Sequence, residues 1–331
     1  MKISRPYYYD SFRCVASACP DSCCKEWDVQ IDEETAAKYR ALPGALGDRL
    51  REVMTEDENG DTVMTITDGR CPMWRQDGLC RIQAELGHKA LCHTCREFPR
   101  LTHDYGDFVE LGLELSCPVA AEMILHGETL PRITEEQPGG EAPEYDEEVM
   151  GILLETRETA LMLLNDRSRP LGETLAVFLM YGYYVQSLID GEEDDGFDEE
   201  TALEQSREYA GQGTALPDFY LKLEILTGAW KRRLEACGDG PWRQEQRAFA
   251  AYCVERYWLQ AVSDYDLVCR VKMTVAGCLL LKTLGGDPVA TAQLYSKEIE
   301  NSADNVDAIL DGAYTSPALT DAALLGMLLE K

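Results

Sequence analysis

The crowding of cysteines toward the N-terminus is the feature that most constrains this chain. Nine of its 13 cysteines fall within the first 117 of 331 residues: Cys14, Cys19, Cys23, Cys24, Cys71, Cys80, Cys92, Cys95 and Cys117. Because 13 is an odd number, a fully paired disulfide framework is excluded, and the cytosol would keep the thiols reduced. The excess of cysteine is local, so we expect a local cause.

The cysteine spacing is typical of a site for a soft metal. Thiolates must converge within about 2.3 Å of such a metal, and turns between the ligands allow this without straining a helix. Zinc and a [4Fe–4S] cluster both accept four cysteines, so spacing alone does not select the metal. The spacings are Cys14-x4-Cys19-x3-Cys23-Cys24, then Cys71 and Cys80 around the Asp77-Gly78 turn, then Cys92-x2-Cys95, then Cys117-Pro118.

Not every cysteine can serve one small site. Adjacent Cys23 and Cys24 cannot both face one cluster without unusual backbone geometry, so one of them packs or serves a second site. The later cysteines are isolated, and we interpret them as small buried apolar side chains. These are Cys237, Cys253, Cys269 and Cys278.

Charge and hydropathy narrow the class of protein. A net charge of −29 with a pI near 4.4 argues against a nucleic-acid partner, whose phosphates would be repelled. It is compatible with a lysine-bearing partner, although an acidic surface also simply keeps a protein soluble. The most apolar stretch, 262–284, contains five charged side chains and predicts a buried helix rather than a membrane span. The polar N-terminus does not match a signal peptide, so we expect a cytoplasmic protein.

The pattern along the chain predicts a mostly α protein in two parts. Residues 1–130 form a cysteine-rich metal-binding domain, 131–144 a linker rich in proline, glycine and glutamate, and 145–331 an antiparallel helical domain. In the first part we expect helices at 35–42, with Asp32 as N-cap, at 45–54 and at 81–91, and a helix opening at Cys117-Pro118. We also expect a hairpin or loop at 55–70 around Asn59-Gly60 and a strand at 107–115. In the second part we expect helices at 145–166, 171–189, 201–210, 218–236, 242–260, 264–284, 288–301 and 317–329.

Several spaced features recur together in the first third of the chain. They include the paired cysteines before Trp27, the DGLC turn, Phe98-Pro99-Arg100 and Ser116-Cys117-Pro118. They lie in the segments CPDSCCKEW, CPMWRQDGLCRIQAELGHKALCHTCREFPR and LELSCPVAAEMIL. Over about residues 14–125, these segments resemble in order the flagellin lysine N-methylase family, within a wider group of zinc- or iron-chelating cysteine-cluster proteins. The helical remainder contains no motif that adds to the resemblance.

The resemblance implies methyl transfer from S-adenosylmethionine to lysine ε-amines of flagellin, with a [4Fe–4S] cluster. Eight matching cysteines for four ligand places means that some are structural or form a second site. Cys92 fits the pattern less firmly. The alternative is a non-enzymatic module in which zinc or an Fe–S centre holds the fold or senses redox state. The matching cysteines are Cys14, Cys19, Cys23, Cys24, Cys71, Cys80, Cys95 and Cys117.

The usual signatures for binding S-adenosylmethionine are missing. Gly44-x2-Gly47 and Gly285-Gly286 lack the strand that precedes a nucleotide-binding glycine turn. A CxxxCxxC motif starting at Cys19 would need a cysteine where the chain has Glu26. The cosubstrate site is therefore expected to be unusual, and one hypothesis is that an incompletely ligated iron binds the methionyl group.

The sequence does not assign a general base. Only a neutral lysine amine can attack a methyl group, and a tyrosine or carboxylate in an apolar pocket could accept its proton. Tyr7–Tyr9, Glu110 and Glu114 lie near the motif segments, and we interpret each as structural. His93 is a lesser candidate for a nitrogen ligand. Arg96 and Arg100 are candidate hydrogen-bond donors to cluster sulfurs or to a cofactor carboxylate, or else surface cations.

Overall fold

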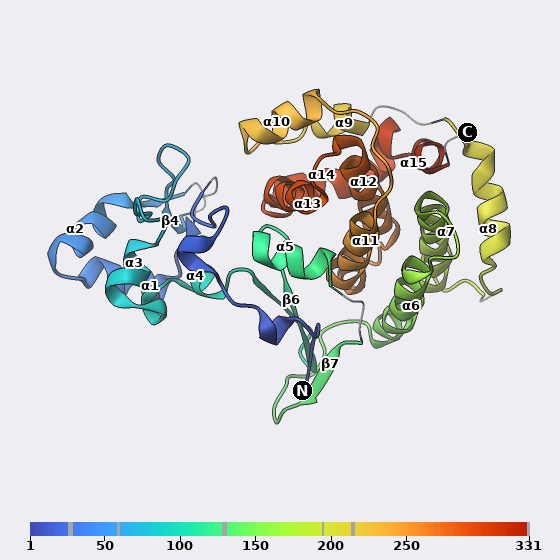
Figure 1. The fold of residues 1–331 in the computed structure, drawn as a ribbon. Helices are drawn as coiled ribbons and strands as arrows, with labels where there is room; N and C mark the ends of the chain where they lie inside the picture. Colours follow the sequence, from blue (N-terminus) through green and yellow to red (C-terminus); the bar gives the residue numbers. More distant parts are fainter. Residues whose placement is uncertain (26–28, 58–59, 128–130, 194, 213–215, 330–331) are drawn as a thin grey trace.

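The computed structural model describes all residues except 26–28, 58–59, 128–130, 194, 213–215 and 330–331. The protein is mostly α, as predicted. Figure 1 shows a small lobe, containing α1 to α4, beside a larger body of helices. Trp27 and Glu26, which enter the sequence argument above, lie outside the described residues.

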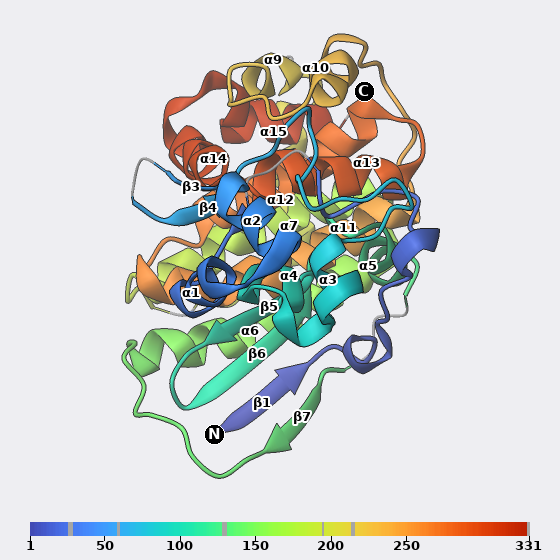
Figure 2. The same ribbon diagram turned by 90° about the vertical axis from the view of Figure 1, so that its left-hand side faces the viewer.

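A four-stranded sheet lies below the helical body (Figure 2). Its order is β5-β6-β1-β7, with β1 parallel to β6 and the other neighbours antiparallel. β6 confirms the strand predicted at 107–115. β7 falls inside the segment predicted to be a linker, because its backbone pairs with the free edge of β1. The strands are β1 (Lys2–Arg5), β5 (Arg100–Asp104), β6 (Phe108–Leu113) and β7 (Ile133–Glu136).

The small lobe combines four helices with a three-stranded sheet of order β2-β4-β3. The β3–β4 hairpin confirms the one predicted, although Asn59 lies outside the described residues. Asp32 caps α1 as predicted, because its Oδ1 accepts a hydrogen bond from Thr35 N at 2.9 Å. The elements are α1 (Glu33–Ala41), α2 (Gly44–Val53), α3 (Arg81–Leu86), α4 (His93–Glu97), β2 (Val29–Gln30), β3 (Met54–Glu56) and β4 (Thr62–Met64).

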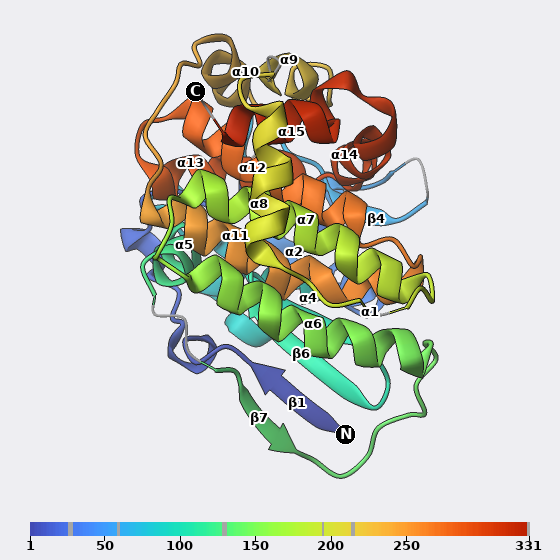
Figure 3. The same cartoon turned by 90° about the vertical axis from the view of Figure 1, so that its right-hand side faces the viewer.

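The helical body is built on α6, α7, α11 and α12. α6 packs on α7 and α11, while α12 packs on α7, α11 and α14. Figure 3 shows α8 lying across α7 on the outer face. The helices are α5 (Pro118–Leu125), α6 (Glu147–Asn165), α7 (Leu171–Ile189), α8 (Glu199–Ser206), α9 (Leu216–Tyr220), α10 (Gly228–Glu235), α11 (Gln244–Tyr257), α12 (Val268–Leu284), α13 (Pro288–Tyr295), α14 (Ala303–Thr315) and α15 (Asp321–Leu328).

Two hydrophobic cores correspond to the lobe and the body. The lobe core contains Val29, Leu50 and Met73, and draws on residues 29–92. The body core takes in Leu113, Leu115 and the buried face of α5 together with the C-terminal helices. Residues 113–125 therefore pack with the helical body although they follow the lobe directly in the chain.

The single helix predicted at 218–236 is wrong, because α9 and α10 are separate. Side chains from the C-terminal part of the chain bind the backbone between them: Asn305 Oδ1 accepts from Glu224 N and Glu298 Oε2 accepts from Leu226 N, each at 2.9 Å. These long-range acceptors replace the helical carbonyls as partners. The prediction also missed α14, whose N-cap is Ser302.

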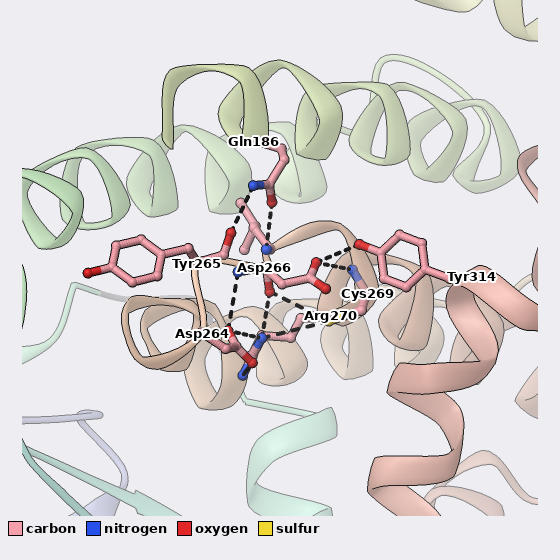
Figure 4. A network of polar contacts seen from close by, with 8 residues as sticks. Gln186, Asp264, Tyr265, Asp266, Cys269, Arg270 and Tyr314 are labelled. Atoms are coloured by element: carbon pink, nitrogen blue, oxygen red, sulfur yellow. Dashed lines mark hydrogen bonds and ion pairs between the residues drawn. The ribbon is translucent and has the colours of Figure 1, made fainter. Parts of the chain in front are cut away.

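α12 begins at Val268, four residues later than predicted. The segment before it is held in a turn (Figure 4), in which Tyr265 has a φ of +60°. Gln186 of α7 binds both Tyr265 O and Leu267 N at 2.8 Å. Asp266 Oδ1 accepts from Cys269 N at 3.2 Å and receives the Tyr314 hydroxyl at 2.7 Å. These contacts turn the backbone away from the helical path.

The apolar helix at the centre of the body is buried along nearly all its length, as predicted from 262–284. Cys253, Cys269 and Cys278 are buried in this region, and Cys237 is partly buried against the core, which agrees with a packing role for these thiols. Among the described helices, none combines the length and apolarity needed to cross a bilayer.

The cap of α6 provides a first prediction. Asp146 Oδ1 accepts from Glu148 N at 3.0 Å and from Val149 N at 3.2 Å. We expect Asp146→Ala to lower the free energy of unfolding by about 1 kcal/mol, because two backbone donors lose their partner. Urea denaturation measures the difference, and Asp146→Asn, which keeps an acceptor oxygen, should lose much less. Equal losses in both variants would rule out a capping role.

Candidate functional site

Six thiols of the lobe lie close enough to influence one another, and we call them the six-thiol group: Cys23, Cys24, Cys71, Cys80, Cys92 and Cys95. Cys95 interacts with Cys92, Cys24 and Cys23. Cys80 interacts with Cys23 and Cys92. Residues separated by up to 72 positions in sequence therefore meet in one place.

Short backbone contacts bring these thiols together. Cys71 N donates to Cys24 O at 2.8 Å, which joins the first two cysteine segments. The turn between Cys71 and Cys80 closes at Gly78, whose φ is +78°, a conformation that favours glycine. Cys80 precedes α3 directly, Cys92 precedes α4, and Cys95 lies on α4. The turns predicted from the spacing thus supply the convergence.

Asp32 and Tyr39 hold α4 against α1. Asp32 uses one oxygen to cap α1 and the other to accept from His93 N at 2.8 Å. The Tyr39 hydroxyl donates to Ala90 O at 2.6 Å, just before Cys92. Both contacts fix the backbone on which Cys92 and Cys95 lie.

Hydrogen bonds between the thiols separate their pKa values. Cys23 bonds to Cys24 and Cys24 bonds to Cys71. The bond from Cys24 lowers the pKa of Cys71, whereas the bond to Cys24, with burial, raises that of Cys23. The bond with Cys95 lowers the pKa of the Cys92 thiol to about 7, while that of Cys95 is raised. Cys71 and Cys92 are therefore the most readily ionised thiols of this set, and ionised thiols bind metals.

The remaining N-terminal cysteines, Cys14, Cys19 and Cys117, are called the three-thiol group, which adjoins the first group because Cys19 interacts with Cys23 as well as with Cys14. The pKa of Cys117 is raised to about 11, mainly by burial, with smaller contributions from Cys19 and Cys14. Five of the eight predicted ligand candidates thus belong to the six-thiol group and three do not. Cys92, which fitted the sequence pattern less firmly, lies within the six-thiol group. The signal available in the sequence was its spacing of three residues from Cys95, which can place both thiols on one face of a helix.

Within the described ranges, no three side chains of His, Cys, Asp or Glu stand in the arrangement of a metal-ion site. The donor chemistry of the six-thiol group nevertheless fits a soft metal, since it supplies only sulfur and is half-buried beside the apolar lobe core. His93 is exposed, and its Nδ1 lies 3.3 Å from Arg96 Nη2. The structure therefore gives His93 a partner other than a metal.

Asp21 ties the cysteine segment to the helical body. Its carboxylate contacts Lys25 at 3.0 Å, Lys297 at 2.5 Å and Gln293 Nε2 at 2.9 Å. Burial opposes ionisation, but the two ammonium groups hold the pKa of Asp21 well below its usual range. The positive charge of Lys297 also acts on Cys23. The six-thiol group thus lies at the junction of lobe and body.

A cavity of about 270 Å³, the junction pocket, opens beside α4. One wall is α4, the other is the end of β6 and the residue after a π-helical turn at Ser296–Glu300. Such turns occur frequently at functional sites. The pocket is lined by His93, Thr94, Glu97, Phe98, Arg100, Glu114 and Asn301.

Glu114, which lines the junction pocket, belongs to a group of charged side chains that extends into the helical body. Burial raises the pKa of Glu114 to about 7, against the attraction of Arg256 and with the repulsion of Glu300. Glu300 accepts from the hydroxyls of Tyr252 at 3.0 Å and Tyr257 at 2.8 Å. Glu114 is thus a carboxyl that changes protonation near neutral pH, and its environment, which no local pattern encodes, explains why sequence reasoning did not assign it.

The other predicted polar candidates have structural surroundings. Glu110 forms a two-pronged ion pair with Arg157, at 2.7 and 2.8 Å, and both side chains are about 5% exposed. Tyr7 and Tyr8 line a separate cavity of about 590 Å³, together with the ion-paired Arg132 and Glu255. The buried ion pair of Glu110 is consistent with a structural role for that side chain.

Clustered thiols on a small lobe, seated against a helical body, define a cysteine-cluster protein. Comparison with curated proteins shows which kind. The chain is 36% identical over 130 residues to flagellar biosynthetic protein FliU of Salmonella muenchen, covering 38% of this chain and 77% of FliU. It is 35% identical over 130 residues to the lysine-N-methylases of Salmonella typhimurium strain LT2 and Salmonella choleraesuis strain SC-B67, covering 32% of each.

The chain therefore belongs to the flagellin lysine N-methylase family. The alignment spans about a third of the length of the curated lysine-N-methylases. No family model and no solved structure matches the chain.

Proposed function

We propose that this protein transfers methyl groups from S-adenosylmethionine to lysine ε-amines of flagellin, with a [4Fe–4S] cluster held by four cysteines of the six-thiol group. The observation that supports this most is the six-thiol group itself, in a chain related to proteins named lysine-N-methylase. Six thiols exceed the four that one cluster requires, so two remain as packing residues or as alternative ligands. Bound there, a cluster would supply an iron that can coordinate the methionyl group of the cosubstrate.

The position of the six-thiol group supports a role at an active site. Asp21 anchors it to α13 and to the π-helical turn, and the junction pocket opens beside Cys92 and Cys95. Net charge also favours a lysine-bearing substrate, since a −29 surface attracts ammonium groups.

The decisive test is incubation of the purified, iron-loaded protein with flagellin and S-adenosylmethionine, followed by mass measurement of flagellin. We expect mass increments of whole methyl groups on lysine, and none with protein from which iron has been removed. Unchanged flagellin mass after incubation with intact, iron-loaded protein would overturn the proposal.

Metal analysis separates the enzyme from a structural module. Brown protein with broad visible absorption supports the cluster, whereas colourless protein with stoichiometric zinc supports a module that only holds the lobe together. The small lobe core gives that alternative its physical basis, because few apolar side chains are buried there. Equal affinity for S-adenosylmethionine before and after iron removal would show that the cosubstrate binds independently of the cluster.

A further inference from the structure

We propose that the junction pocket receives the substrate lysine side chain and that Glu114 is the catalytic residue that accepts the proton of its ammonium group. This inference rests on the proposed methyl transfer and adds to it the group that activates the nucleophile. The pocket, its lining and the surroundings of Glu114 each support it.

The pocket has the size and lining for one long side chain. Its volume of about 270 Å³ falls below the roughly 300 Å³ at which cavities begin to hold drug-sized ligands, so a lysine fits better than a whole nucleoside. Phe98 offers an apolar surface for the methylene chain, and two carboxyl groups line the pocket: Glu114, and Glu97, which is paired with Arg96 at 3.1 Å. Asn301 adds a neutral amide.

The pocket also lies where the methyl donor is proposed to bind. His93 and Thr94, which line it, lie between Cys92 and Cys95 in the chain, so the pocket wall and two members of the six-thiol group share the short helix α4 and its N-cap. Glu114 is held on the opposite side, because Glu114 N donates to Pro99 O at 2.8 Å directly after Phe98.

The charged groups around Glu114 come from several elements. Arg256 and Tyr252 of α11 and Glu300 of the π-helical turn face it from the body. The pocket adds His93 and Glu97 from α4 and Arg100 from β5. Arg100 lies over the rings of Tyr9 and Phe12, at 5.8 and 5.3 Å from their centroids. Among the described residues Glu114 forms no salt bridge within 4 Å, and its carboxyl has a side-chain hydrogen bond with Ser116.

Burial raises the pKa of Glu114 to about 7, compared with a reference value near 4.3. A carboxylate with a raised pKa binds a proton more strongly than an exposed glutamate does, and it is still ionised above neutral pH. Glu114 therefore combines the charge that attracts an ammonium group with the basicity that removes its proton.

The proposed step balances as follows. The lysine ammonium loses one proton to the Glu114 carboxylate and becomes a neutral amine. The nitrogen lone pair attacks the methyl carbon of the sulfonium donor, forming the N–C bond while the C–S bond breaks and its electrons stay on sulfur. The products are a methylated ammonium, a neutral thioether and protonated Glu114, which releases its proton to solvent.

The test is the pH dependence of methyl transfer at saturating substrate in Glu114 variants of the full, iron-loaded chain. In the wild type we expect the rate to rise with pH to a plateau, with a midpoint near pH 7. Glu114→Gln should lower the rate by about 10²- to 10⁴-fold, the contribution of a general base, and abolish that midpoint. Glu114→Asp, which keeps a carboxylate, should restore the pH dependence and part of the rate. Glu235→Gln, at an exposed position of α10, is the matched control.

Iron content and thermal unfolding of each variant identify any loss of fold or cluster. Should Glu114→Gln not fold, the comparison of wild type with Glu114→Asp still decides, because a base shortened by one methylene must slow the reaction. A folded Glu114→Gln variant with wild-type rate and pH profile would overturn the inference and leave the methyl transfer standing. Absence of methylation by the wild type would overturn the proposed function instead.

Discussion

We expect that replacing Cys24 with serine will remove most of the iron from the purified protein, whereas replacing Cys14 will leave the iron content near that of the wild type. Cys24 stands in the middle of the six-thiol group, with bonds to Cys23 and Cys71 and an interaction with Cys80. Cys14 belongs to the three-thiol group and is exposed. A four-cysteine site that loses one thiolate keeps only three sulfur ligands, so we expect a several-fold drop in iron per protein.

A series of single substitutions extends this test to the other members. The six-thiol group provides more sulfur ligands than one cluster needs. For two of its members, the serine variant should therefore keep the iron content of the wild type. Cys253→Ser is the matched control, since Cys253 is 3% exposed in the helical core. Cys92→Ser is the most informative variant, because the structure includes Cys92 in the group while the family pattern does so less firmly. Iron loss in Cys14→Ser but not in Cys24→Ser would show that the three-thiol group, rather than the six-thiol group, provides ligands to the cluster.

Replacing Arg157 with methionine should lower the free energy of unfolding by about 3–5 kcal/mol. Arg157 and Glu110 form a buried two-pronged pair, and removing the guanidinium leaves an uncompensated buried carboxylate. Arg132, whose Nε lies 3.9 Å from Glu110, compensates only in part. Urea denaturation measures the loss. Arg49→Met, which breaks an exposed pair with Glu52, should cost less than about 1 kcal/mol.

The effect of Arg157→Met should depend on pH. Burial opposes ionisation of Glu110, but the bonds from Arg157 hold its pKa below the usual value. The pair therefore stabilises the folded state above the unfolded-state pKa of glutamate, near 4.3, and this contribution is lost as the pH falls through the lower folded-state pKa. In the variant the carboxyl can protonate, so the deficit should be largest at neutral pH and shrink in acid. An unchanged deficit at low pH would assign the effect to lost packing rather than to charge.

Features that depend on a few neighbouring residues could be predicted from the sequence. The capping of α1 by Asp32 and the opening of α5 at Cys117-Pro118 are examples. Each needs only a side chain within three positions of the backbone group it satisfies, or a proline ring that fixes φ. The strand β6 followed from alternating apolar residues for the same reason.

Features that depend on distant residues could not be predicted. The break between α9 and α10 requires Asn305 and Glu298, which lie more than 70 positions away. β7 forms only because β1 offers it an edge, although its own composition reads as a linker. The junction pocket likewise brings Glu97, Glu114 and Asn301 together from three separate segments.

The sequence by itself determined that the N-terminal third would gather thiols, because turns between closely spaced cysteines let their side chains converge on one site. Only the tertiary structure decided which thiols meet. Cys24 and Cys71 are 47 positions apart and join through a backbone hydrogen bond, while Cys117 packs with the helical body because α5 belongs to that core. Burial, which raises the pKa of Glu114, likewise arises from packing between segments rather than from the residues beside it.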